Sequence, residues 1–268
     1  MLNKERTIIE MSFKQSFAWR FAMLLSIIVG PLVILANYVI WKGLYAAAHT
    51  DVIRGFTFEQ MVVYIAISFM ISYLTWNNME VSLRDDVRNG SLATYLLRPI
   101  SYLHFQFINM IGNRFLAMFL EFLPVLAIVT LLLGPAVITG NWGYFIIGAI
   151  IASIINFLIR ALMGMLAFYF VRPRGSIEVL KVLMTLLGGM VLPLSLFPAI
   201  FQKISLFLPF QFLAYAPTRL YMGNYELAGI ILSPWQVLLL GLAQCAVLFI
   251  IVRLVWNVSI KKFCGVGT

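Results

Sequence analysis

Six long apolar runs constrain the fold of this chain more than any other feature of its sequence. A helix needs about 20 apolar residues to cross the hydrocarbon core of a bilayer, which is about 30 Å thick. Only 11% of the residues are charged, against about 25% in soluble domains. The sequence therefore predicts an all-α integral membrane protein with six transmembrane helices. The runs are Phe21 to Trp41, Gln60 to Trp76, Ile108 to Leu133, Trp142 to Val171, Leu180 to Leu196, and Trp235 to Trp256.

The tryptophans support this division of the chain independently. Indole rings prefer the headgroup level of a membrane. Every tryptophan of the chain lies at or just outside an end of one of the runs: Trp19, Trp41, Trp76, Trp142, Trp235 and Trp256.

Residues 1–20 are too polar to cross the membrane. Apolar residues such as Ile8 and Phe17 alternate loosely with basic residues such as Lys14, a pattern typical of a helix lying in the membrane interface. A solvated leader is the alternative. We divide the chain into an interfacial amphipathic helix, residues 1–20, and a six-span transmembrane domain, residues 21–268.

The distribution of Lys and Arg predicts the orientation, because basic residues accumulate in cytoplasmic loops. With the N-terminus inside, 13 basic residues are cytoplasmic and 4 are external, and both termini are cytoplasmic. The net charge of +9 forms no continuous stripe, so the sequence does not indicate a nucleic-acid partner. The external residues are Lys42, Arg54, Lys203 and Arg219. The cytoplasmic residues are Lys4, Arg6, Lys14, Arg20, Arg84, Arg88, Arg98, Arg172, Arg174, Lys181, Arg253, Lys261 and Lys262.

A stretch before the last run, Phe197 to Pro217, is too apolar for an ordinary loop. Pro198, Pro209 and Pro217 divide it into two pieces of about ten residues. Each piece is too short to cross a bilayer, and proline disfavours a continuous helix. We therefore expect a re-entrant helix pair, introduced by Pro193, within an external re-entrant region at residues 197–224.

The loop at residues 77–107, between the second and third runs, carries the most information about function. A charged part ends at the turn signal Asn89-Gly90. An amphipathic piece follows and stops at Pro99, and Ser101 is placed to cap a helix entering the third run. A solvated connector is one interpretation, and a surface that docks onto a partner is the other. The many leucines and aromatic residues favour docking.

Motifs of soluble catalysis are absent from the sequence. There is no P-loop, and the two histidines, His49 and His104, lie in different loops. Cys245 lies inside an apolar run and Cys264 in the tail, and no metal-ligand spacing occurs. We therefore expect no catalytic residue, no metal site and no cofactor in this chain.

The loop at 77–107 resembles the corresponding loop of the type-2 permeases of ABC exporters. The resemblance rests on Gly90-Ser91-Leu92, on Leu96-Leu97-Arg98-Pro99-Ile100-Ser101, and on a polar-aromatic run leading into a span. It extends over the whole chain, with an interfacial helix, six spans and a re-entrant pair before the last span. The nearest branch contains presumed drug, antibiotic and viologen exporters.

This resemblance implies that the loop at 77–107 is a coupling loop that touches a separate ATPase. The residues carried over are Asp86, Arg88, Gly90, Leu96, Leu97, Arg98, Pro99, Ile100, Ser101, Tyr102 and His104. Leu97, Ile100 and Tyr102 are expected to make the apolar contacts, and Arg98 the polar one.

Four of the polar residues within the runs are candidates for a structural or functional role: Arg114, Glu121, Asn156 and Arg160. A charge in a bilayer costs several kcal/mol unless it is paired or hydrated. Glu121 and Arg160 fall at a similar depth, counted from the cytoplasmic ends. Three interpretations remain open: a buried ion pair of these two residues, a polar lining of the transport route, and snorkelling of the arginines.

Together these features predict the permease subunit of an ATP-driven ABC exporter, a transport subunit and not an enzyme. By the resemblance, it moves an amphiphilic or drug-like substrate out across a bacterial-type cytoplasmic membrane. The expected partners are ABC ATPase subunits that bind ATP and Mg, a second permease copy or paralogue, and membrane lipid. An ion-coupled secondary transporter or channel is the alternative, and a membrane-embedded enzyme is a weaker one.

Overall fold

The computed structural model of the chain describes residues 7, 20–117, 122–134, 139–170 and 174–263. The described chain is mostly helical. Four of its helices are long and apolar enough to cross a membrane: Ile28–Ala48, Phe58–Arg88, Trp142–Phe168 and Pro234–Lys262. The prediction of an all-α membrane protein is confirmed at this level. The predicted interfacial helix at 1–20 lies outside the described residues, apart from positions 7 and 20.

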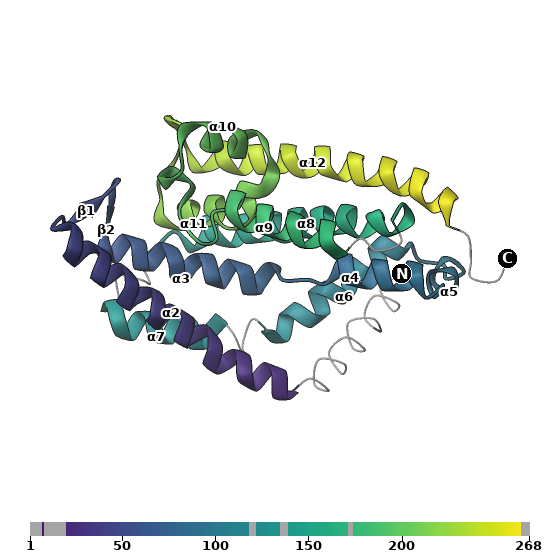
Figure 1. Ribbon diagram of the computed structural model, residues 1–268, viewed down its shortest axis with the longest axis horizontal. Helices are drawn as coiled ribbons and strands as arrows, with labels where there is room; N and C mark the ends of the chain where they lie inside the picture. Colours follow the sequence, from purple (N-terminus) through teal and green to yellow (C-terminus); the bar gives the residue numbers. More distant parts are fainter. Residues whose placement is uncertain (1–6, 8–19, 118–121, 135–138, 171–173, 264–268) are drawn as a thin grey trace.

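The helices follow one another with few strands between them (Figure 1). The α-helices are α2 (Arg20–Ala48), α3 (Phe58–Thr75), α4 (Met79–Arg88), α5 (Leu92–Leu96), α6 (Tyr102–Ala117), α7 (Leu123–Leu133), α8 (Trp142–Met165), α9 (Arg174–Leu187), α10 (Ala199–Phe207), α11 (Tyr215–Met222) and α12 (Pro234–Ser259). The 3₁₀ turns are η3 (Leu166–Phe168), η4 (Leu194–Leu196), η5 (Pro209–Leu213) and η6 (Ile260–Lys262).

Two short antiparallel hairpins complete the described elements. In the first, β1 (Val52–Ile53) pairs with β2 (Phe56–Thr57), with Val52 opposite Thr57. In the second, β3 (Tyr225–Leu227) pairs with β4 (Ile230–Leu232), with Glu226 opposite Ile231. Figure 1 places the first hairpin, α10 and α11 at one end of the molecule, and α4 and α5 at the other. We call these the hairpin end and the coupling-loop end.

Capping residues set where two of the membrane helices begin. The Thr57 side chain accepts from the Gln60 N–H at 3.3 Å, and the Gln60 side chain accepts from the Thr57 N–H at 3.1 Å. Ser233 and Gln236 form the same reciprocal pair at the start of α12, where Pro234 occupies the first turn. Such capping boxes satisfy N–H groups that have no partner inside the helix.

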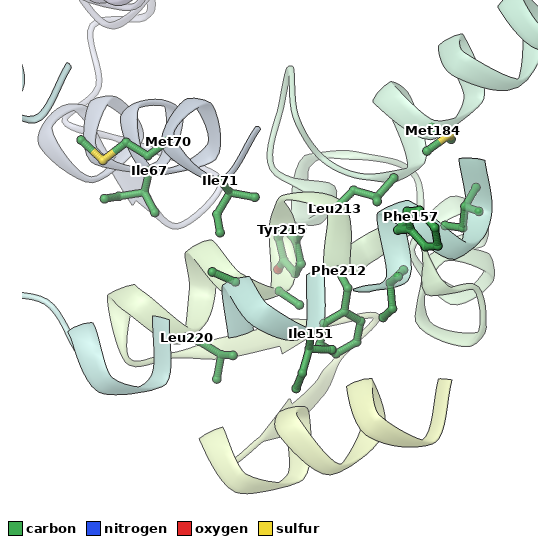
Figure 2. Close-up of a cluster of buried hydrophobic side chains, with 14 of the residues drawn as sticks. Ile67, Met70, Ile71, Ile151, Phe157, Met184, Phe212, Leu213, Tyr215 and Leu220 are labelled. Carbon is green, nitrogen blue, oxygen red and sulfur yellow. The ribbon is translucent and has the colours of Figure 1, made fainter. Parts of the chain in front are cut away.

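Helix α8 lies in the centre of the bundle and packs against α3, α4, α11 and α12. Small residues permit this packing: a Cβ at Gly148 would lie 3.0 Å from Leu220 of α11, and one at Gly241 of α12 would lie 2.6 Å from Phe212. Close approach at small residues is typical of packed membrane helices. Figure 2 shows apolar side chains from several elements meeting around Tyr215 and Phe212.

The predicted runs match the helices unequally. The second, fourth and sixth runs correspond to α3, to α8 with η3, and to α12, within a few residues. The first begins as predicted but α2 continues to Ala48. The third is described as α6 and α7, with residues 118–121 between them outside the description.

The prediction of one helix from Leu180 to Leu196 was wrong. Helix α9 starts earlier, at Arg174, and ends at Leu187. Gly189 then adopts a positive φ of 73°, and Pro193 precedes η4. Glycine lowers helix stability by about 1 kcal/mol relative to alanine and accepts the left-handed conformation without strain, so Gly188 and Gly189 end the helix despite the apolar sequence around them.

Candidate functional site

The coupling loop, residues 77–107, forms two helices at the coupling-loop end (Figure 1). Helix α3 ends at Thr75, and Asn77 organises the break that follows: its amide donates to the Thr75 carbonyl at 3.2 Å and accepts from the Met79 N–H at 3.3 Å. Helix α4 then begins. Because the break is only three residues long, α4 stays close to the membrane helix that precedes it.

Helix α4 packs directly on α8 at a glycine. A Cβ at Gly164 would lie 3.0 Å from the Cβ of Leu83 and 3.2 Å from the Cα of Glu80. Leu83 is fully buried in this contact. Gly164 therefore lets the backbone of α4 approach α8 more closely than a larger residue would allow.

A buried ion pair joins the first turn of α4 to α8. Glu80 Oε1 lies 2.7 Å from Arg160 Nη1 and 3.4 Å from Lys181 Nζ of α9. The Glu80 side chain is 1% exposed and that of Arg160 is 11% exposed. Glu80 Oε2 has no hydrogen-bond partner among the described residues. One carboxylate thus holds cations from two different helices.

Further contacts hold the Arg160 guanidinium in place. Its Nε donates to Asn156 Oδ1 at 2.8 Å, and the Asn156 amide donates to the carbonyl and the hydroxyl oxygen of Thr75, each at 3.2 Å. The guanidinium carbon lies 5.5 Å from the centre of the Trp76 ring, a cation–π distance. We call Glu80, Arg160, Lys181, Asn156 and Thr75 the ionic cluster. It ties α3, α4, α8 and α9 together.

This cluster gives Arg160 a partner that the sequence-based hypothesis did not consider, and the expected pair with Glu121 stays untested. Arg160 does form a buried ion pair, but with Glu80 of the coupling loop, and Glu121 lies outside the described residues. Glu80 belongs to the charged part of the loop at 77–107, and the sequence alone did not single it out as a partner of Arg160. The sequence did hold a signal for the Glu80–Arg160 pair. Glu80 lies about one helical turn beyond Trp76, which places it near the depth at which the fourth run ends.

A second set of bonds fixes the last turn of α4. The Asp86 carboxylate accepts from the Ser91 hydroxyl and from the Tyr102 hydroxyl, each at 2.6 Å. The Gln106 amide donates to the Tyr102 oxygen at 3.0 Å. Burial, followed by the bond to Asp86 and its charge, raises the pKa of Tyr102. The Tyr102 hydroxyl therefore keeps its proton and remains a donor.

Tyr102 also connects the coupling loop to α12. Its ring stacks on Trp256 with the centroids 5.7 Å apart and the planes within 5°, and the residue is only 2% exposed. The expectation that Tyr102 contacts a partner at the surface was wrong. An aromatic residue in a loop can face outward or inward, and here its hydroxyl is satisfied by Asp86 from within the protein.

Exposed apolar side chains of the coupling loop lie at the end of α5 and in the turn after it. Leu97 is 87% exposed and Leu96 is 44% exposed, whereas Leu92 of the same helix is buried. The Arg98 guanidinium lies 4.5 Å from the centre of the Tyr95 ring. Leu97 and Arg98 are therefore at the surface, where the expected partner contacts require them.

The other predicted residues of the coupling loop are spread around this surface. Arg88 and His104 are exposed, and Ile100 is half-buried. Gly90 has a positive φ of 75° in the turn between α4 and α5, which fits the predicted Asn-Gly turn. Pro99 lies between α5 and α6, and α6 begins directly after Ser101.

Arg114 binds within the bundle instead of standing alone in the apolar run. Its Nη1 donates to the Tyr73 carbonyl at 3.3 Å, near the end of α3. The last carbonyls of a helix lack partners inside the helix, so a basic side chain at this point satisfies one of them.

The predicted re-entrant region contains short helices at the hairpin end (Figure 1). Pro198 precedes α10, and η5 begins at Pro209, so both prolines separate pieces as expected. Pro217 does not: it is the third residue of α11, where a missing N–H breaks no bond inside the helix.

The turn after α9 and helix α11 of this region are each bonded to α3. The Tyr64 hydroxyl donates to the Gly189 carbonyl at 2.6 Å, and the hydroxyls of Ser68 and Thr218 lie 3.2 Å apart. Residues 211–221 are all buried. The irregular backbone between the short helices is thus enclosed by protein, which meets the condition for such backbone in a re-entrant segment.

A comparison with protein-family models finds one that covers most of the chain. The model is described as "ABC-2 family transporter protein" and matches residues 31–267. No curated protein matches the chain. The matched range includes the coupling loop, the ionic cluster and the re-entrant region.

Proposed function

The chain belongs to the ABC-2 family of transporters, and on that premise we propose that it is the permease subunit of an ABC exporter driven through its coupling loop. Family membership makes it a transport subunit of an ABC transporter that associates with an ABC ATPase. It favours this function over an ion-coupled transporter, a channel or a membrane-embedded enzyme.

The proposal rests on two features of the coupling loop: an exposed apolar residue, Leu97, and a preceding helix, α4, that is bonded to the rest of the bundle. Leu97 is 87% exposed and directly follows α5 at the coupling-loop end. The segment behind it is held to the bundle by Glu80 and by Asp86. A partner that pushes on Leu97 thus moves α4, and with it α6 and α8.

The finer features of the proposal rest on the sequence. Six spans, with both termini in the cytoplasm, are supported by the apolar runs and by the distribution of basic residues in the sequence. The helices α10 and α11 form an external re-entrant pair that does not cross. The membrane is a bacterial-type cytoplasmic membrane.

Export of an amphiphilic or drug-like substrate is supported by the resemblance to drug, antibiotic and viologen exporters. ATP and Mg bind to the partner ATPase, because the sequence of this chain has no P-loop. A second permease copy or paralogue completes the transporter, and the substrate route runs between the two permeases. Motion of the ATPases shifts the permeases by differential affinity between two states.

The test begins with identification of the ATPase. The chain is purified from its own membranes, and co-purifying proteins with a P-loop are identified by mass spectrometry. The complex is then reconstituted with Leu96→Ala/Leu97→Ala permease. Loss of a central interface contact of about 2 kcal/mol weakens ATPase binding about 30-fold and abolishes stimulation of ATP hydrolysis.

Phe207→Ala is the matched control, because Phe207 is 82% exposed but lies in α10 at the opposite end. Membrane insertion of every variant is measured separately. If the correctly inserted double variant retains and stimulates the ATPase like the control, the coupling loop does not bind it.

A further inference from the structure

A groove lies between α6, α8 and α12 at the coupling-loop end. Its volume is about 420 Å³, within the range of roughly 300–1,000 Å³ usual for small-molecule sites. Helix α8 forms the floor, and α6 and α12 form the walls. The residues that line it are Ser101, Leu103, His104, Phe107, Ile154, Phe157, Leu158, Phe249, Val252, Arg253, Trp256 and Asn257.

The groove is polar at one end and apolar along the rest. Ser101 and His104 belong to the start of α6, and Arg253 and Asn257 to the last two turns of α12. All four are exposed. The apolar lining lies deeper, and its floor residues Phe157 and Leu158 are 4% and 5% exposed. A ligand that fits this surface has a polar head and an apolar tail.

The polar end favours a negative charge. Arg253 contributes a full positive charge, His104 lies beside it as a polar residue, and none of the described lining residues is acidic. Arg253 forms no ion pair with any described residue. Arginine forms strong paired hydrogen bonds with phosphate, and basic pockets between membrane helices on the cytoplasmic side bind anionic headgroups.

The groove reaches the ring stack that holds the coupling loop. Trp256 lines its end and stacks on Tyr102, 5.7 Å away between centroids, and Tyr102 in turn donates to Asp86. Phe249, which lines the apolar part of the groove from α12, is 56% exposed, so this part of the groove is open at the surface.

We propose that this groove binds an anionic phospholipid of the cytoplasmic leaflet. The phosphate lies at Arg253 and His104, and part of one acyl chain lies against the apolar lining. The choice of leaflet rests on the topology proposed above, whereas binding itself does not. Through the stack of Trp256 on Tyr102, the bound lipid touches the same residue that holds the coupling loop.

The test is native mass spectrometry of the full-length chain in detergent, titrated with phosphatidylglycerol or with phosphatidylcholine carrying the same acyl chains. We expect tighter binding of phosphatidylglycerol. A basic residue at a membrane surface contributes about 1 kcal/mol to anionic-lipid binding, so Arg253→Gln weakens phosphatidylglycerol binding about fivefold and leaves phosphatidylcholine unchanged. The control Lys203→Gln, an exposed cation of α10 at the hairpin end, changes neither.

A second variant tests the apolar part. Ile154→Trp fills the groove and weakens the binding of both lipids, with folding checked by thermal melting. Inorganic phosphate at millimolar concentration does not displace the lipid, because the acyl chain supplies part of the affinity.

Four results would each overturn the proposal: equal affinity for the two lipids, no difference between Arg253→Gln and Lys203→Gln, displacement by phosphate alone, or an Ile154→Trp variant that loses its dimer mass but keeps its lipid. The last result assigns the groove to a second copy of the chain. Because no ATPase is present, failure here leaves the Leu97 experiment unaffected.

Discussion

Replacement of Glu80 by Gln removes the one negative charge of the ionic cluster while keeping the shape of the side chain. The carboxylate faces Arg160 at 2.7 Å and Lys181 at 3.4 Å. In Glu80→Gln, the Arg160 guanidinium loses its charged partner and keeps only neutral ones, among them Asn156 and the Trp76 ring. Removal of one partner of a buried pair typically costs about 3–5 kcal/mol. We expect about 3 kcal/mol here, because Arg160 is 11% exposed.

The geometry predicts an order among the single variants. Arg160→Gln leaves Glu80 with Lys181 at 3.4 Å, so its loss is smaller, about 2 kcal/mol. Lys181→Gln costs about 1 kcal/mol or less, because the Lys181 side chain is 32% exposed and exposed charges contribute little. The double variant Glu80→Gln/Arg160→Gln leaves neither charge of the pair, and its loss is smaller than the sum of the two single losses.

The measurement is the free energy of unfolding in detergent micelles titrated with a denaturing detergent. Arg84→Gln is the matched control, because it breaks the Arg84–Asp85 pair of the same helix, in which the Asp85 side chain is 50% exposed. We expect less than about 1 kcal/mol for the control. Equal losses in Glu80→Gln and Arg84→Gln, or strictly additive losses in the double variant, would refute the ionic cluster as described.

Two further predictions address packing and topology. Gly164→Ala places a Cβ 3.0 Å from Leu83 and 3.2 Å from the Glu80 backbone, and we expect it to destabilise the protein by about 1–3 kcal/mol. The control Gly143→Ala, whose Cβ would have nothing within 4 Å, leaves the stability unchanged. The same unfolding titration measures both variants, and equal stability would contradict the close α4–α8 contact. In intact cells, with Cys245 and Cys264 replaced, an impermeant thiol reagent labels a cysteine placed at Asn141 but not one at Ser101, and the reverse pattern contradicts both termini being cytoplasmic.

The membrane helices were the most predictable part of the structure. Length and apolar composition alone locate α3, α8 and α12, because the bilayer requires about 20 apolar residues from each span. The fifth run shows the limit of this rule. Its composition is apolar throughout, but Gly188 and Gly189 end α9 through backbone conformation, which hydropathy does not report.

The position of the coupling loop could be predicted from the sequence, but its long-range ion pair and hydrogen bonds could not. The turn at Gly90 and the exposed Leu97 follow from local sequence signals. The pairing of Glu80 with Arg160 joins residues 80 positions apart, and that of Asp86 with Tyr102 joins residues 16 apart. Such contacts depend on how α4 rests on α8, which no local pattern specifies. Tyr102 was therefore placed at the surface, although the fold turns it inward.

The two attachments of α4 lie six residues apart, at Glu80 and at Asp86, which is about 9 Å along a helix. They connect α4 to different helices: Glu80 binds α8 and α9, whereas Asp86 binds the start of α6. A force applied beyond Asp86, at Leu97, consequently acts as a torque about Glu80. Helix α4 would then pivot at the Glu80–Arg160 ion pair. If the coupling loop is displaced as proposed above, α6 would turn relative to α8, up to the point at which the Glu80–Arg160 pair breaks.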